Sequence, residues 1–201
     1  MDFQTLLKGT LIGFSIAAPV GPIGILCIQR TLAKSRSSGL VSGLGAATAD
    51  GLFGTVAALG LTTVSDILIG QQMWLRLFGG IFLVYLGIRT LLSEPSGKTT
   101  DPVKGNLFAD YLSTLGLTAA SPLTILSFAA IFTGLNSSNS STPSALILAL
   151  GVFLGSALWW TILSTGVGIF RRIFSKSALR IVNRVSGLVI TAFAFYIFIG
   201  I

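Results

Sequence analysis

Asp50 is the residue whose position points most directly to chemistry. It lies in a run of small residues near the middle of an apolar stretch long enough to cross a bilayer. A carboxylate near the centre of a spanning helix costs about 2.5–3.5 kcal/mol, so such a residue faces a cavity or a partner. We therefore expect Asp50 to bind a cationic group or to carry a coupling proton. The alternative is a structural hydrogen bond to unpaired backbone nearby.

Two breaks at proline interrupt apolar stretches at comparable places in the two halves of the chain. Residues 19–22 read Pro-Val-Gly-Pro, and residues 121–122 read Ser-Pro. Lipid cannot satisfy the backbone groups freed at a break, so each break must line a protein-walled or water-filled cavity. Paired breaks of this kind are the best sequence-level pointer to the binding site of a transporter.

The two breaks and the acid could together hold a zwitterion. A helix that starts after such a break presents free N–H groups and the positive end of its dipole, which suits a carboxylate. The carboxylate of the acid suits an ammonium group, and an amino acid carries both. The substrate-binding candidates are Pro19, Gly21, Pro22, Asp50, Ser121 and Pro122.

Six apolar stretches must position these residues. A membrane-spanning helix needs about 20 apolar residues. The stretches cover residues 3–28, 40–64, 73–92, 107–135, 144–169 and 179–201. They are continuous rather than alternating, which predicts helices. With 52% hydrophobic and 9% charged residues, the chain (residues 1–201) is predicted to be a single all-α integral membrane domain whose first and fourth helices are broken at proline.

The basic residues indicate an orientation. All of the 13 lysines and arginines except Lys8 and Arg76 flank the stretches on one side. The positive-inside rule places that side in the cytoplasm and both termini outside a cytoplasmic (inner) membrane. The net charge of +7 is thus interpreted as topogenic, not as a nucleic-acid site. Arg30 is given mainly this role, and Asp66 and Asp110, near stretch ends, are expected to be solvated.

The two halves look like a duplication. Residues 1–93 and 107–201, joined by a polar linker at 94–106, show similar small-residue and proline patterns in the same order. Three spans per half turn the second copy over, which predicts two inverted-topology three-helix repeats that expose a midplane site alternately. Composition bias is the alternative explanation. The glycines Gly9, Gly13, Gly39, Gly43, Gly151 and Gly155 could let helices approach closely.

Other side chains narrow the classes of function. One cysteine, Cys27, and no histidine exclude an internal disulfide and argue against a zinc or copper site. No nucleophile–base pair is visible, so we predict no cofactor and no enzyme. Thr48 and Trp159 are candidates for the cavity wall, with core packing as the alternative for Trp159 and Trp160.

An ordered string of motifs resembles the lysine exporter (LysE/RhtB-type) family of amino-acid translocators. Its first half comprises residues 19–22, 28–32, 39–40 and 43–50. Its second half comprises Ser121-Pro122, Gly151, Ser156, Trp159 and residues 183–187. Two departures are a proline shifted by one position in the first break and Ser121 where the family often has asparagine. The resemblance implies amino-acid export driven by the proton gradient.

The leading hypothesis is a secondary transporter that exports amino acids or related small zwitterionic metabolites, with Asp50 as the proton-coupling residue. A metal-ion exporter of related architecture is the alternative, and it would need several oxygen ligands within the membrane. The expected partners are an amino acid and membrane lipid, with assembly into a homo-oligomer left open.

Overall fold

The computed structural model describes residues 2–19, 21–59, 70–93, 106–121, 124–128, 142–170 and 176–199. Within these residues all regular structure is helical. The helices are α1 (Asp2–Ala17), α2 (Pro22–Ala33), α3 (Arg36–Ala58), α5 (Gln72–Leu91), α6 (Leu107–Ala119), α8 (Thr142–Phe170) and α9 (Lys176–Ile199), and residues 124–128 are also helical. The predictions for Asp66, Pro122 and most of the 94–106 linker lie outside the described residues.

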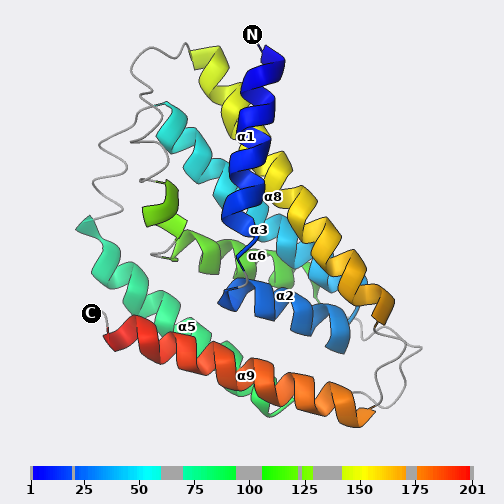
Figure 1. The fold of residues 1–201 in the computed structure, drawn as a ribbon. Coiled ribbons are helices and arrows are strands. Elements are labelled where there is room, and N and C mark those ends of the chain that lie inside the picture. The colour runs from blue at the N-terminus through cyan, green and yellow to red at the C-terminus, as the bar shows by residue number, and fades with distance from the viewer. Residues whose placement is uncertain are drawn as a thin grey trace.

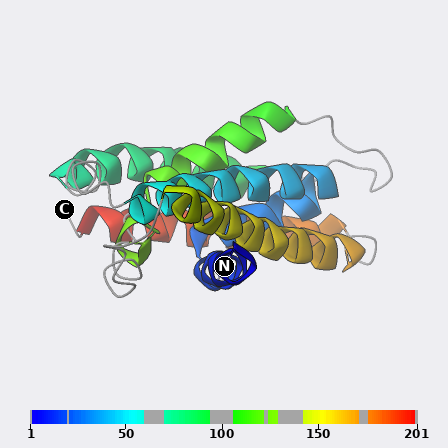
Figure 2. The same cartoon turned by 90° about the horizontal axis from the view of Figure 1, so that it is seen from above.

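The helices pack in two groups around a short central helix. Helix α8 packs along both α1 and α3, α6 packs along α3, and α5 and α9 pair with each other. Figure 1 shows the α5–α9 pair at the bottom, with α2 between this pair and the other group, and Figure 2 shows the same arrangement with α1 seen nearly end-on. Because α2 contacts both α3 and α9, it joins the two groups.

The predicted break in the first stretch is present. Helices α1 and α2 meet at an angle of 81°. Gly21 is the N-cap of α2 in an extended conformation, and Pro22 is the first helical residue. Proline suits that position because its fixed φ is helical and its missing N–H would lack a helical partner. The break turns the chain so that the start of α2 faces the interior.

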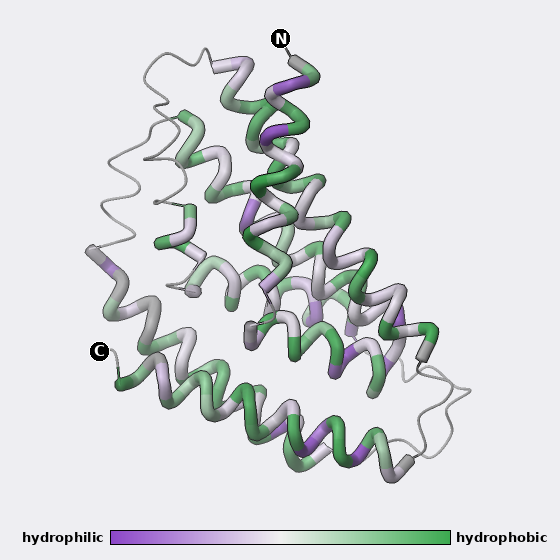
Figure 3. The backbone as a smooth tube through the Cα atoms, in the orientation of Figure 1, coloured by the Kyte–Doolittle hydropathy of each residue, from purple (hydrophilic) through white to green (hydrophobic). Residues whose placement is uncertain are grey.

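Several helices are long and apolar enough to cross a membrane. Among the described residues these are Arg36–Ala58, Thr142–Ile169 and Ser177–Tyr196, and the bent α1–α2 pair makes a fourth if it is counted as one span. Leu77–Leu91 is a shorter apolar helix. Figure 3 shows apolar residues recurring along each helix. The chain is therefore a multi-pass membrane protein, and the count of six spans stays a prediction.

Glycines bring α1 and α8 into backbone contact. A methyl group added at Gly9 or Gly13 would collide with the backbone of α8, and one added at Gly151 or Gly155 would collide with the backbone of α1. The expected role of small residues in close helix approach is confirmed for these four glycines. Gly39 and Gly43 instead face side chains, those of Thr31 and Trp160.

Candidate functional site

A cavity of about 440 Å³ lies where the α1–α2 break meets the other helices. Its wall is formed by the break itself, the middle of α3, one turn of α5, the end of α6 with the residues after it, and a tryptophan of α8. The described residues of the predicted binding set all line this cavity: Pro19, Gly21, Pro22, Asp50 and Ser121. Pro122, the remaining member, lies outside the described residues.

The start of α2 offers backbone amides to the cavity. Ile23 and Gly24 line it, and they occupy the first turn of α2, where an N–H group has no carbonyl one turn earlier to bind. Gly21 has no side chain to cap them, and no side-chain cap is present. The end of α2 that faces the cavity therefore carries N–H donors without a partner inside the helix, together with the positive end of the helix dipole.

The second break is organised differently. Ser121 Oγ accepts a hydrogen bond from the Thr124 amide at 3.4 Å. The Ser121 carbonyl accepts one from the Ile125 amide at 3.1 Å. Ser121 thus caps the helical residues that follow it. The Ser121 side chain satisfies the Thr124 N–H, whereas Gly21 has no side chain that could bind the equivalent N–H at the first break. Helix α2 is therefore the stronger candidate for binding an anionic group.

Asp50 is buried, with 3% of its surface exposed. Ser156 Oγ donates a hydrogen bond of 2.7 Å to Asp50 Oδ2, and Trp160 Nε1 donates one of 3.1 Å to the same serine oxygen. The alternative prediction is a structural hydrogen bond between Asp50 and backbone at the α1–α2 break. The described contacts differ from it, because the hydrogen-bond partner of Asp50 is Ser156 on α8. Among the described contacts only Oδ2 is engaged, which leaves Oδ1 for a ligand.

The two wall candidates, Thr48 and Trp159, lie elsewhere. Thr48 Oγ1 donates to the Leu44 carbonyl and accepts from the Tyr111 hydroxyl at 2.9 Å. The Trp159 ring packs edge-on against Phe14, with centroids 5.4 Å apart. Neither is among the described residues that line the cavity, and Trp160 is. Successive helical side chains point about 100° apart, so the neighbouring tryptophan takes this place.

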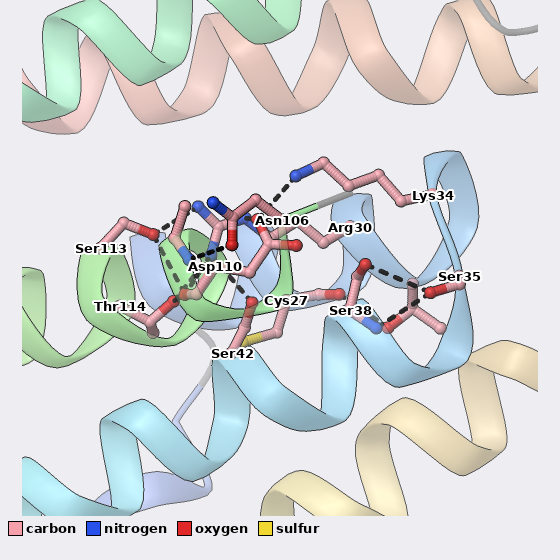
Figure 4. A network of polar contacts seen from close by, with 12 residues as sticks. Cys27, Arg30, Lys34, Ser35, Ser38, Ser42, Asn106, Asp110, Ser113 and Thr114 are labelled. Atoms are coloured by element: carbon pink, nitrogen blue, oxygen red, sulfur yellow. Dashed lines mark hydrogen bonds and ion pairs between the residues drawn. The ribbon is translucent and has the colours of Figure 1, made fainter. Parts of the chain in front are cut away.

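A second polar cluster surrounds Arg30 at the far end of α2 (Figure 4). Arg30 Nη1 donates to Ser42 Oγ and to the Asp110 carbonyl, each at 2.8 Å. Asp110 Oδ1 lies 3.4 Å from Arg30 Nε and 2.6 Å from Lys34 Nζ. The expectation that Asp110 would be solvated is wrong, because it is 2% exposed. The first turn of α6 faces α2 and α3 rather than water, and Arg30 has a structural role beyond topology.

Further polar contacts extend this layer to α5 and α9. Gln29 Nε2 donates to Asn183 Oδ1 at 3.2 Å. Asn183 Nδ2 in turn donates to the Ser93 carbonyl at 3.1 Å. Helix α2 is therefore anchored to α3, α6 and α9 by polar side chains at one end, while its other end faces the cavity.

Ser156 and Asp110 are functional candidates that the sequence did not single out from their types and spacing. Serine is common in membrane helices, an acid near the end of a stretch is expected to be solvated, and the partner of each of these two side chains comes from a distant segment. Cys27 is a free thiol buried in the core. Among the described residues no group of three or more His, Cys, Asp or Glu could hold a metal ion.

Comparisons with known proteins give a family and two relatives. The LysE type translocator family matches residues 14–200. A Bacillus subtilis (strain 168) protein named "Putative amino acid efflux protein YcgF" is 27% identical over 196 residues, which is 94% of this chain and 93% of the relative. The Escherichia coli (strain K12) "Uncharacterized membrane protein YahN" is 25% identical over 172 residues, 83% of this chain and 77% of that protein. No solved structure matches. The chain belongs to the LysE type translocator family.

Proposed function

We propose that the protein is a secondary transporter that exports amino acids or related small zwitterions across the cytoplasmic membrane. The observation that carries the proposal is the single cavity shared by the α1–α2 break, Ser121 and the buried acid Asp50. Membership of a translocator family and a relative named for amino acid efflux support it.

In the proposed binding mode, the two charged groups of the substrate bind two different polar groups of the cavity. The substrate carboxylate binds the N–H groups of Ile23 and Gly24 at the start of α2, where the helix dipole favours negative charge. The substrate ammonium binds Asp50 Oδ1. Ser156 holds the other oxygen of this carboxylate at 2.7 Å and so fixes its orientation. Pro19, Gly21, Pro22 and Ser121 line the same cavity, and Pro122 is kept in the proposed site from the sequence alone.

Proton coupling would act through the same acid. A proton on Asp50 removes the negative charge that binds the ammonium group, so protonation and substrate binding exclude each other. A proton that enters from outside displaces the substrate outward, and its release to the cytoplasm makes the carboxylate ready for the next substrate. The exchange of one proton for one substrate requires no second acid in the cavity, and Asp50 is the acid among its described lining residues.

The predicted inverted repeat would supply the motion. If residues 1–93 and 107–201 are equivalent, α1 corresponds to α6, α3 to α8 and α5 to α9. The packing follows this scheme: α1 packs on α8 as α6 packs on α3, and α3–α8 and α5–α9 pair equivalent helices. Rocking one repeat against the other would expose the cavity to each side in turn. The polar layer around Arg30 would separate the cavity from the cytoplasm in the state seen here.

The proposed orientation is testable apart from transport. The ends of α2 and α8 and the start of α9 lie on the same side in Figure 1, and α2 and α9 carry basic residues there. With that side in the cytoplasm, both termini lie outside the inner membrane. A C-terminal alkaline phosphatase fusion, active only outside, should be active, and a green fluorescent protein fusion at the same place should be dark. The reverse pattern would overturn the orientation.

The transport test uses the purified protein in liposomes loaded with a mixture of labelled amino acids. We expect efflux that depends on the protein and accelerates when the outside is made acidic relative to the inside. The Asp50→Asn variant should reconstitute normally and lose the acceleration, since an amide cannot carry the coupling proton. Protein-dependent release of none of the amino acids would overturn the proposed function. Full acceleration in the variant would overturn the role of Asp50.

A further inference from the structure

We propose that the cavity selects amino acids with neutral, apolar side chains and that Leu83 of α5 contacts that side chain. This inference rests on the proposed function and names its substrate class. It follows from the charges that the cavity does and does not contain, from the chemistry of its wall and from its size.

The polar groups of the cavity match the ammonium and carboxylate groups that every amino acid carries, and no further charge. Asp50 is the only charged residue among the described residues that line it. The substrate's ammonium group binds the Asp50 carboxylate, and the substrate's carboxylate binds the amides at the start of α2. A lysine, arginine or glutamate side chain would bring a further charge into a buried site without a counter-ion, which is strongly unfavourable.

The charged side chains around the other end of α2 are already paired with one another. Arg30 and Lys34 both bind Asp110, and none of the three is among the described residues that line the cavity. Arg30 is in the last turn of α2, at the other end of the helix from Gly21, and Figure 4 shows Lys34 and Asp110 beside it. A charged substrate side chain in the cavity would therefore not reach them without a rearrangement of this cluster.

Most of the rest of the wall is apolar, although the hydroxyl residues Ser15, Thr118, Ser121, Thr124 and Ser127 also line it. Ile16, Ile23, Leu83, Leu117 and Trp160 line the cavity beside the polar groups. Two of its hydroxyls are engaged within their own segments: Thr118 Oγ1 donates to the Thr114 carbonyl at 2.9 Å, and Ser121 Oγ caps Thr124. A hydrocarbon side chain would gain from burial against this wall, and a polar one would lose hydrogen bonds to water.

The size of the cavity suits one amino acid. Small-molecule pockets have volumes of about 300–1,000 Å³, and this cavity lies near the lower end at about 440 Å³. It can hold an amino acid with a leucine, methionine or phenylalanine side chain. A peptide or a large conjugate would need more room.

Leu83 and Leu86 form a natural matched pair for testing this inference. Both are buried leucines on α5, at 5% and 8% exposure, and both belong to the apolar cluster that includes Leu26 and Ile190. Only Leu83 is among the described residues that line the cavity. Truncation of either residue should cost similar core packing, but only truncation of Leu83 should change which substrates fit.

The first experiment is counterflow of labelled leucine into liposomes that contain the protein. Unlabelled leucine, isoleucine, methionine and phenylalanine should each compete at least about tenfold better than lysine, arginine or glutamate. Equal or better competition by the charged amino acids, with counterflow intact, would overturn the inference and leave the proposed function standing. If no amino acid gave counterflow, the proposed function would fail, and the inference with it.

The second experiment compares Leu83→Ala with Leu86→Ala. In Leu83→Ala the ratio of the half-saturating concentrations of phenylalanine and leucine should fall by about tenfold, because the added space favours the larger side chain. In Leu86→Ala the ratio should stay at the wild-type value even where the total rate falls. An unchanged ratio in Leu83→Ala, or an equal shift in both variants, would show that Leu83 does not contact the substrate.

Discussion

Arg30 and Asp110, 80 residues apart in the sequence, form a buried ion pair in which the guanidinium Nε lies 3.4 Å from Oδ1 of the carboxylate. The same carboxylate oxygen accepts a hydrogen bond from Lys34 Nζ at 2.6 Å, and Oδ2 is buried with no hydrogen-bond partner in the described part of the chain. One acid from the second half thus serves as the shared counter-ion of two cations from the first half. This contact ties α2 to α6.

Neutralising Asp110 should therefore destabilise the protein strongly. In Asp110→Asn, Arg30 and Lys34 lose their shared counter-ion, and leaving a buried charge unpaired costs about 3–5 kcal/mol. The measurement is the free energy of unfolding of the purified protein, from a denaturant titration in detergent micelles. Lys34→Gln is the control, because its side chain is 34% exposed and its removal leaves the Arg30–Asp110 pair intact. Equal stability of the two variants would contradict the importance of the pair.

Ser156 and Ser164 give a second matched comparison, because both are fully buried serines on α8. Ser156 donates to Asp50, whereas Ser164 Oγ has no hydrogen-bond partner among the described residues. A hydrogen bond to a charged group contributes about 1.5–3 kcal/mol. In Ser156→Ala the half-saturating substrate concentration should therefore rise by at least about tenfold, as measured by counterflow.

The Ser164→Ala variant should keep the wild-type half-saturating concentration and be equally or more stable. Its hydroxyl is buried without a partner, so its removal takes away a desolvation cost rather than a bond. A loss of affinity of the same size in both variants would show that α8 packing, and not the bond to Asp50, is responsible.

The close contact of α1 and α8 makes a prediction about stability. A methyl group at Gly13 would collide with the Val152 carbonyl, whereas one at Gly166 would meet nothing within 4 Å. Alanine is favoured over glycine in a helix by roughly 0.5–1 kcal/mol. Thermal unfolding of the purified variants should therefore show Gly166→Ala at or above the wild-type midpoint and Gly13→Ala several degrees below it. A stable Gly13→Ala would mean that α1 can move away from α8 at little cost.

The sequence could predict those features that depend on one segment at a time. The break at Pro19–Pro22 follows from proline geometry, and the burial of Asp50 follows from its position inside an apolar stretch. That these elements meet at one cavity was expected because lipid tolerates neither free backbone nor a lone carboxylate.

The partners of the polar residues could not be predicted, because they come from distant segments. Asp110 lies near the start of its stretch, and nothing local distinguishes a solvated acid there from one that is buried against α2. Likewise, Trp159 and Trp160 are equivalent in sequence, and only the rotation of α8 about its axis decides which of them faces the cavity. Predicting that rotation requires the packing of α8 against α1 and α3.

This difference between the two tryptophans leads to a last prediction. Trp160 Nε1 donates to Ser156 at 3.1 Å, and its ring lines the cavity, whereas Trp159 packs on Phe14. Phenylalanine preserves most of the packing and removes the N–H. Loss of one neutral hydrogen bond corresponds to about 0.5–1.5 kcal/mol, so Trp160→Phe should weaken transport by a few-fold to about tenfold.

Tryptophan fluorescence is the measurement that separates the roles of Trp159 and Trp160. Addition of leucine should change the emission of the wild-type protein and of Trp159→Phe, because Trp160 remains beside the substrate. The same addition to Trp160→Phe should give little change, although Trp74 and Trp159 still fluoresce. If the signal disappeared in Trp159→Phe and persisted in Trp160→Phe, α8 would present the opposite tryptophan to the substrate, and the cavity wall described above would be wrong on this side.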